Sequence, residues 1–222
     1  YEQRRARVIA QSLVAQGYTE VLNFPFVSQD RILQMGYMDG RELSYKVANP
    51  MSEDQPWLRP HLLPGLLDVA SRNFNRGFKD FAIFELGSIF RKNINLSEEV
   101  SPLLGKRPTQ KEIAALYKTV PNQLKHLGAV MVGKVATENW QGEQRIYQWH
   151  DAVSSVENLL ELLGFSWDLK RSDFAPWHPG RCAEFRVDGK AVAHAGELHP
   201  RVVANLNLPE RSCAFGILLS EV

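Results

Sequence analysis

The stretch over residues 47–90 constrains the fold more than any other part of the sequence. It opens with a turn at Asn49, and two prolines, Pro56 and Pro60, then enclose a short apolar piece. Proline biases the residue before it away from the helical conformation, so the chain between these prolines cannot coil. The sequence therefore predicts that residues 57–59 are extended and that no helix begins before the second proline.

A helix and a buried strand follow in the same stretch. Leucine and alanine recur at helical spacing over residues 62–76, and Gly77 is placed to end the helix. Residues 81–87 are apolar apart from Glu85, which predicts a buried strand that carries one acid. Since an unpaired buried carboxylate is costly, we predict that Glu85 and Arg59 share one buried polar network. Ligand binding by either residue is the less favoured alternative.

The remaining segments alternate between helices and hairpins without a regular strand-helix-strand order, which favours an antiparallel sheet with helices packed on it. Asp-Gly at 188–189 lies between two alternating runs and is a strong hairpin signal. This hairpin would place residues 178–181 beside residues 196–200. The predicted helices cover residues 2–16, 30–36, 62–76, 150–164 and 200–205, and the predicted strands cover residues 19–27, 43–47, 57–59, 81–87, 127–135, 183–187, 190–194 and 213–219.

The domain organisation is predicted to be a single domain over residues 1–222 with a loop-rich insertion around 92–123. The insertion mixes proline, glycine, serine and charge without a clear periodicity, as a long surface loop does. The chain lacks an initiator methionine and ends abruptly, so we expect it to be a fragment of a longer chain.

Composition argues against several classes of function. The chain has 26 basic and 25 acidic residues, and this net charge of +1 lacks the excess that strong nucleic-acid binders usually carry. Its two cysteines, Cys182 and Cys213, are far apart, which favours free thiols in a reducing compartment over a disulfide framework. No apolar run approaches the length of a membrane span.

Motifs for phosphate, metal or nucleophilic chemistry are absent or weak. The sequence has no glycine-rich phosphate loop and no G-x-S-x-G elbow. His178, His194, Glu197 and His199 suggest a metal site, but no cysteine pair and no helical histidine pair supports them, so structural histidines are favoured. The partners of a nucleophile system meet only in space, so the sequence disfavours that class without deciding it.

Five ordered motifs closely resemble the synthetase-like core of bacterial phenylalanyl-tRNA synthetase β subunits. The motifs are NPMSEDQPWLRPHLLPGLL, FAIFELGSIF, HPGRCAEF, GELHP and the terminal AFGILLSEV. The resemblance covers nearly the whole chain, from Arg4 to Val222, and is weakest between Asn93 and Asn122. It implies an α+β fold, with an antiparallel β-sheet flanked by helices as in the core of class II aminoacyl-tRNA synthetases.

The same resemblance implies a chain that does not catalyse. In active class II relatives the last motif reads F-G-x-G-x-x-R, and its arginine faces the ATP phosphates. Aligned on Gly216, this chain has Leu218 in place of the second glycine and Glu221 in place of the arginine. A carboxylate about 4 Å from a phosphate repels it by about 4 kcal/mol at an effective dielectric of about 20. The loop of the second motif, taken as residues 75–80, is short for one that grips ATP.

The resemblance further implies partners and a cellular compartment. It implies an α2β2 heterotetramer in the cytoplasm, in which the α subunit uses ATP and Mg to charge tRNA with phenylalanine. This chain would support the α subunit and meet tRNA indirectly or peripherally, with no membrane contact. The helix over 62–76, together with the extended piece before it, is the predicted face for the α subunit.

No catalytic, cofactor-binding or metal-binding residue is assigned to this chain. A structural network or vestigial cleft is predicted instead, made of Asn49, Arg59, Glu85, His178, Arg181, Glu197 and His199. Two alternatives stay open at this point, an independent adenylating enzyme of class II ancestry and a small-ligand-binding module that uses the old pocket.

Overall fold

The computed structural model describes residues 2–91, 105–135 and 145–222. The helices are α1 (Glu2–Ala15), α2 (Gln29–Gln34), α3 (Leu63–Asn75), α4 (Gln110–Thr119), α5 (Trp149–Leu162) and α6 (Pro200–Asn205), with a closing 3-10 helix η1 (Leu219–Glu221). The strands are β1 (Thr19–Glu20), β2 (Phe26–Val27), β3 (Trp57–Leu58), β4 (Phe81–Arg91), β5 (Asn122–Val132), β6 (Asp168–Arg171), β7 (Trp177–Val187), β8 (Lys190–Leu198) and β9 (Cys213–Leu218).

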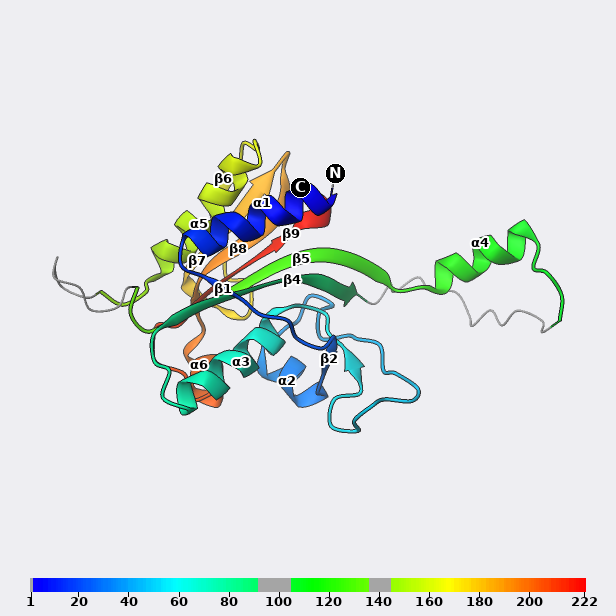
Figure 1. Cartoon of the computed structure of the whole chain (residues 1–222), viewed down its shortest axis with the longest axis horizontal. Coiled ribbons are helices and arrows are strands. Elements are labelled where there is room, and N and C mark those ends of the chain that lie inside the picture. The colour runs from blue at the N-terminus through cyan, green and yellow to red at the C-terminus, as the bar shows by residue number, and fades with distance from the viewer. Residues whose placement is uncertain (1, 92–104, 136–144) are drawn as a thin grey trace.

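A seven-stranded sheet in the order β1-β4-β5-β9-β8-β7-β6 forms the centre of the molecule, and β2 pairs with β3 separately. All neighbouring pairs in the large sheet are antiparallel except β1 with β4, which is parallel. Helices α1 and α5 cover one face, and α2, α3 and α6 lie on the other (Figure 1). The predicted α+β architecture is confirmed.

Each face of the sheet has its own apolar core. Side chains alternate along a strand, so neighbouring residues point to opposite faces. Phe84 and Phe215 pack with α1 and α5, whereas the adjacent Ile83 and Ala214 pack with α3 and α6. The alternation holds both layers of helices on a single sheet.

Helix α3 belongs to the second of these cores. Its leucines at 63, 66 and 67 and Ala70 are fully buried against the sheet, as is Leu62 just before the helix. The helix ends before Gly77, whose positive φ of 99° suits glycine, as predicted. The prediction that this helix offers an apolar face to a partner is wrong, because the chain's own sheet already covers that face.

The predicted hairpin at 188–189 is confirmed. Asp188 and Gly189 both have positive φ, 49° and 77°, as the favoured two-residue turn requires. Cys182 then pairs with Gly196. The segments 178–181 and 196–200 therefore lie side by side, as predicted.

Two predicted strands are split or reduced in the structure, and one short strand was not predicted. The strand predicted over 19–27 is split into β1 and β2, and the Pro25 carbonyl accepts a hydrogen bond from the Arg59 amide where the chain leaves the sheet edge for β3. The strand predicted over 43–47 is reduced to one bridge between Lys46 and Trp57, and β6 was not predicted. The four residues of β6 are mostly polar and too few to show a periodicity, and alternation over 19–27 does not show where the strand leaves the sheet, so tertiary pairing decides these elements.

The insertion is more structured than predicted. Residues 110–119 form α4, and its capping box of Thr109 and Glu112 is readable in the sequence as T-x-x-E. Strands β4 and β5 pair along their whole length, so the connection of this hairpin is 92–121 and not the short segment 75–80. Residues 92–104 of the predicted insertion lie outside the described residues.

Within the described part of the chain, no helix is long and apolar enough to cross a membrane.

Candidate functional site

A buried ion pair lies on the α3 side of β4. Arg59 Nη1 donates to Glu85 Oε1 at 2.6 Å, and the two residues are only 7% and 1% exposed. Arg59 Nε also donates to the carbonyl of Ser88 at 3.0 Å, and Asn23 Nδ2 donates to Glu85 Oε2 at 2.7 Å. The predicted pairing of Arg59 with Glu85 is confirmed, and the structure adds Asn23, which the sequence did not single out.

The Arg59 side chain of this pair also covers the backbone of β4 on the α3 side. A Cβ added to Gly87 would collide with Arg59 Nη2, so the guanidinium lies directly against the strand backbone. Because Arg59 and Glu85 satisfy each other, the pair leaves no uncompensated charge for a ligand.

Two buried histidines cover the backbone at the third motif. The rings of His61 and His126 meet edge to face with centroids 4.3 Å apart. A Cβ added to Gly216 would lie 3.0 Å from His126 Cε1 and 3.1 Å from His61 Cε1. Burial, together with the nearby Arg91 and Arg41 charges, lowers the pKa of His126 to about 3, and burial holds the pKa of His61 well below its usual range. Both rings are therefore neutral at pH 7.

A second group of side chains fills the space next to these histidines. The buried Arg41 guanidinium lies between two aromatic rings, 4.0 Å from the Tyr37 centroid and 3.8 Å from the Phe174 centroid. Its Nη2 donates to the carbonyl of Ala175 at 2.6 Å. Phe174 in turn stacks on His194 at 3.9 Å. The α3 side of the sheet is thus occupied by the chain's own aromatic and cationic side chains.

The degenerate third motif offers neither group that active relatives use. Leu218 packs, partly buried, against the α3-side core at the position of the second glycine. Glu221 lies in η1, and its carboxylate is 3.5 Å from Lys190 Nζ at the surface. Gly216 itself pairs with Gly128 in the sheet under the two histidine rings.

Arg181 and Glu197 form a second ion pair, away from the first. Arg181 Nη1 contacts both carboxylate oxygens of Glu197, at 2.7 and 2.8 Å. Glu197 pairs in register with Cys213, whose side chain belongs to the core under α1 and α5. Glu85 faces the α3 side instead, so the residues predicted from sequence as one network lie on opposite faces of the sheet.

The other predicted residues have local structural contacts or none. His178 Nδ1 accepts from the Gly180 amide at 2.9 Å. His199 Nδ1 accepts from the Arg201 amide at 3.1 Å and caps α6. Asn49 is exposed in the loop before β3. Within the described residues, no group of three or more His, Cys, Asp or Glu side chains is placed to hold a metal ion.

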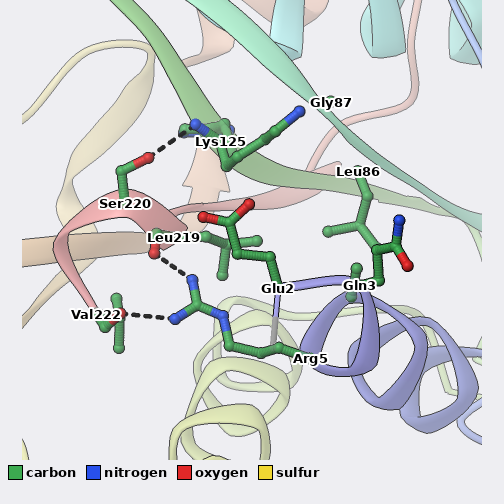
Figure 2. A pocket seen from close by; sticks show the side chains of 11 residues that line it. Glu2, Gln3, Arg5, Leu86, Gly87, Lys125, Leu219, Ser220 and Val222 are labelled. Atoms are coloured by element: carbon green, nitrogen blue, oxygen red, sulfur yellow. Dashed lines mark hydrogen bonds between the residues drawn. The ribbon is translucent and has the colours of Figure 1, made fainter.

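A cavity of about 470 Å³ lies on the other face, between the first turn of α1, the β4–β5 pair and η1. Figure 2 shows Arg5 reaching from α1 to η1, where its guanidinium donates to the carbonyls of Val222, at 2.7 Å, and Leu219. Ser220 Oγ accepts from the Lys125 amide at 2.8 Å on the same rim. The sequence carries no signal for this cavity, because the two ends of the chain meet here only in the fold.

Comparison with known proteins identifies close relatives over almost the whole chain. Residues 1–219 match the family described as the phenylalanyl tRNA synthetase beta chain CLM domain. Proteins named phenylalanine–tRNA ligase beta subunit from Thermobifida fusca and Streptomyces avermitilis are each 38% identical, over 97% and 98% of this chain. The chain spans 27% of the length of each of these relatives.

Solved structures support the fold independently. A pyrrolysyl-tRNA synthetase from Desulfitobacterium hafniense superposes with a TM-score of 0.63 over 98% of this chain and 64% of its own length. A second structure of pyrrolysyl-tRNA synthetase from the same organism has a TM-score of 0.61 over 97% of this chain. With 16% and 15% sequence identity these neighbours show the fold alone, and they confirm the predicted class II synthetase fold.

Proposed function

Because the chain belongs to the family of phenylalanyl tRNA synthetase beta chain CLM domains, we propose that it is the non-catalytic, synthetase-like core of a phenylalanine–tRNA ligase beta subunit. In this role it supports an alpha subunit that charges tRNA with phenylalanine and uses ATP and Mg. The proposed assembly is a heterotetramer of two alpha and two beta subunits in the cytoplasm, where charged tRNA is consumed.

The covered glycine at the third motif carries the non-catalytic part of the proposal. In an adenylating relative, the backbone at this glycine must be open to the nucleotide. Here the rings of His61 and His126 lie against Gly216, and Arg59 lies against Gly87. All three covering side chains are buried, so opening the site would break a packed core and the Arg59–Glu85 pair. The same closure argues against an independent adenylating enzyme and against a ligand-binding module that uses the old pocket.

The proposed contact with the alpha subunit rests on an exposed apolar surface beside β1. Val21 hydrogen-bonds to Phe84, and Asn23 hydrogen-bonds to Glu85, so residues 21–23 run along the outer edge of β4. Leu22 and Phe24 in this segment are 85% and 78% exposed. Soluble proteins rarely leave neighbouring large apolar side chains in water, and such patches mark interfaces. This edge replaces α3 as the proposed contact with the alpha subunit.

Co-expression of full-length alpha and beta subunits tests the proposal. We expect the pair to purify as one complex that charges tRNA with phenylalanine, while beta alone gives no phenylalanine-dependent pyrophosphate exchange. Phe24→Asp should weaken assembly at least tenfold, since it places a charge in the apolar contact. The matched control is Leu162→Asp on α5, where an apolar side chain is 50% exposed.

Two results would contradict the proposal. Pyrophosphate exchange by beta alone, lost on mutation of its own cleft residues, would show that this chain catalyses. A complex that tolerates Phe24→Asp as well as Leu162→Asp would remove the proposed contact surface.

A further inference from the structure

A groove of about 240 Å³ lies where the start of α5 meets the end of β6 and the first part of β7. One side of it is apolar, with Trp149 and Leu169, and the other side is cationic, with Arg171 and Arg181. None of its lining residues is an aspartate or a glutamate. The groove is separate from the closed cleft over Gly216 and from the proposed contact beside β1.

The apolar and the cationic residues of the groove lie on the same face of the sheet. In the sheet, Leu169 pairs with Phe185 and Arg171 pairs with Ala183. Both partners point into the core under α5, so Leu169 and Arg171 project on the α5 face, where Trp149 begins the helix. Strand β6 is the outermost strand of the sheet, so nothing within the sheet covers this side.

The apolar side of the groove is open to solvent. Trp149 is 43% exposed and Leu169 is 50% exposed, although both lie beside a packed core. An exposed tryptophan ring is a good stacking surface for a flat aromatic group.

The cationic side keeps an unbalanced charge. Glu197 neutralises Arg181 through its bidentate contact. Arg171, in contrast, forms no ion pair with any residue in the described ranges. A guanidinium next to an aromatic stacking surface, with no acid in the lining, favours a ligand that joins a flat ring to an anionic group.

We propose that this groove binds one nucleotide of a single-stranded RNA segment, with its base on Trp149 and its phosphate on Arg171. Stacking on aromatic side chains beside a cationic groove is the usual way proteins hold unpaired RNA. The inference rests on the proposed function, because tRNA is the RNA that such a subunit meets. It assigns a direct tRNA contact to this domain, and the near-neutral net charge of the chain is compatible with a contact this small.

Equilibrium binding of fluorescently labelled tRNA to the alpha–beta complex, measured over a range of salt concentrations, tests the inference. Trp149→Ala should weaken binding about tenfold through loss of stacking, and Trp149→Tyr should restore most of it. Arg171→Glu should weaken binding about tenfold at low salt. It should also reduce the slope of the logarithm of the binding constant against the logarithm of the salt concentration by about one, the value for one lost phosphate contact. The Michaelis constant for tRNA in the charging reaction should rise in step, with little change in kcat at saturating tRNA.

Arg76→Glu is the matched control, because Arg76 is an exposed arginine at the end of α3 on the other face of the sheet. It should bind tRNA as the unchanged complex does, and the melting temperatures of all variants should agree. If Trp149→Ala and Arg171→Glu keep full affinity and salt dependence in a complex that charges tRNA, the inference is overturned and the proposed function stands.

Two further outcomes separate the remaining explanations. If the Trp149 and Arg171 variants lose assembly with the alpha subunit, the groove is a protein contact and the inference is overturned. If substitution of Trp149 and of Arg171 weakens tRNA binding but the unchanged complex charges no tRNA, the proposed function fails while the groove assignment is supported.

Discussion

At the residue scale, the buried Arg59–Glu85 pair is held by further partners within the chain. Arg59 and Glu85 face each other inside the α3-side core, and Asn23 and the Ser88 carbonyl complete their hydrogen bonds. Glu221 and Lys190 form an exposed pair at the end of the chain. The two pairs use the same chemistry in different surroundings, which makes their energetic contributions separable.

Glu85→Ala should lower the free energy of unfolding by about 3–5 kcal/mol, because it leaves the Arg59 guanidinium buried without a counter-charge. Glu221→Ala should change it by less than about 1 kcal/mol, since exposed pairs contribute little. Urea unfolding of both variants measures the difference. Equal losses for the two variants would show that Arg59 finds water or another partner when Glu85 is removed.

The buried histidines predict a dependence of stability on pH. Burial lowers the pKa of His126 and of His194 to about 3, and it lowers the pKa of His61 well below its usual range. Below about pH 6.5 the unfolded chain binds protons at these histidines that the folded chain does not, so stability falls as the pH falls. For His126 and His194 this loss continues down to about pH 3.

Each buried histidine should contribute about 1 kcal/mol of lost stability per pH unit in the middle of that window. His126→Gln should therefore show a shallower loss between pH 6 and pH 4 in urea unfolding, compared with the unchanged chain. His178→Gln is the control, because that side chain lies at the surface end of β7. Parallel pH profiles for the unchanged chain and His126→Gln would mean that His126 is protonated in the folded state.

At the element scale, the helices differ in what stabilises them. Helix α3 is held by full burial of its leucines, whereas no residue of α4 is buried. Figure 1 shows α4 standing apart from the sheet and from the other helices. A helix of this length is marginal in water without packing, so the capping box at Thr109 has a larger part in forming α4.

Thr109→Ala should destabilise α4 locally by about 1 kcal/mol and leave global unfolding unchanged. Amide hydrogen exchange should become faster over residues 110–119, with the same urea midpoint. Ser28→Ala removes the matching cap of α2, whose Ile32 is fully buried, and it should lower the urea midpoint. A shift of the midpoint by Thr109→Ala would show that α4 packs against the folded body.

At the scale of the whole molecule, the sheet separates three surfaces. The cleft over Gly216 is closed on the α3 side, the groove at Trp149 is open on the α5 side, and the apolar edge at Phe24 lies beside β1. The class II synthetase fold is thus kept, while the α3 side of the sheet at Gly216 is filled by the chain's own side chains.

ATP or phenylalanine, each at about 1 mM, should leave the melting temperature of the beta subunit unchanged. A ligand that binds the folded state with a dissociation constant of about 10 μM would add about 2.7 kcal/mol at that concentration. The alpha–beta complex is the positive control, since the proposed function places the ATP and phenylalanine sites in the alpha subunit. A rise in melting temperature for beta alone, abolished by replacing residues around Gly216, would show that the closed cleft opens.

The sequence by itself determined the features that depend on local pattern. Helical spacing of leucines located α3, the Asp-Gly pair located the β7–β8 hairpin, and the isolated acid on an apolar strand led to the pairing of Glu85 with Arg59. The ordered motifs indicated the family, which the comparisons confirm. Local pattern suffices in these cases because periodicity, turn chemistry and the cost of burying a charge act within a few residues of the chain.

Only the tertiary structure decided which distant residues meet and on which side of the sheet. The periodicity of α3 shows that one face is buried, but it does not show whether the cover is a partner or, as found, the chain's own sheet. The spacing between His61 and His126 carries no signal that their rings would close over Gly216. Glu85 and Glu197 look alike in sequence, yet they lie on opposite faces, because strand register sets the direction of each side chain.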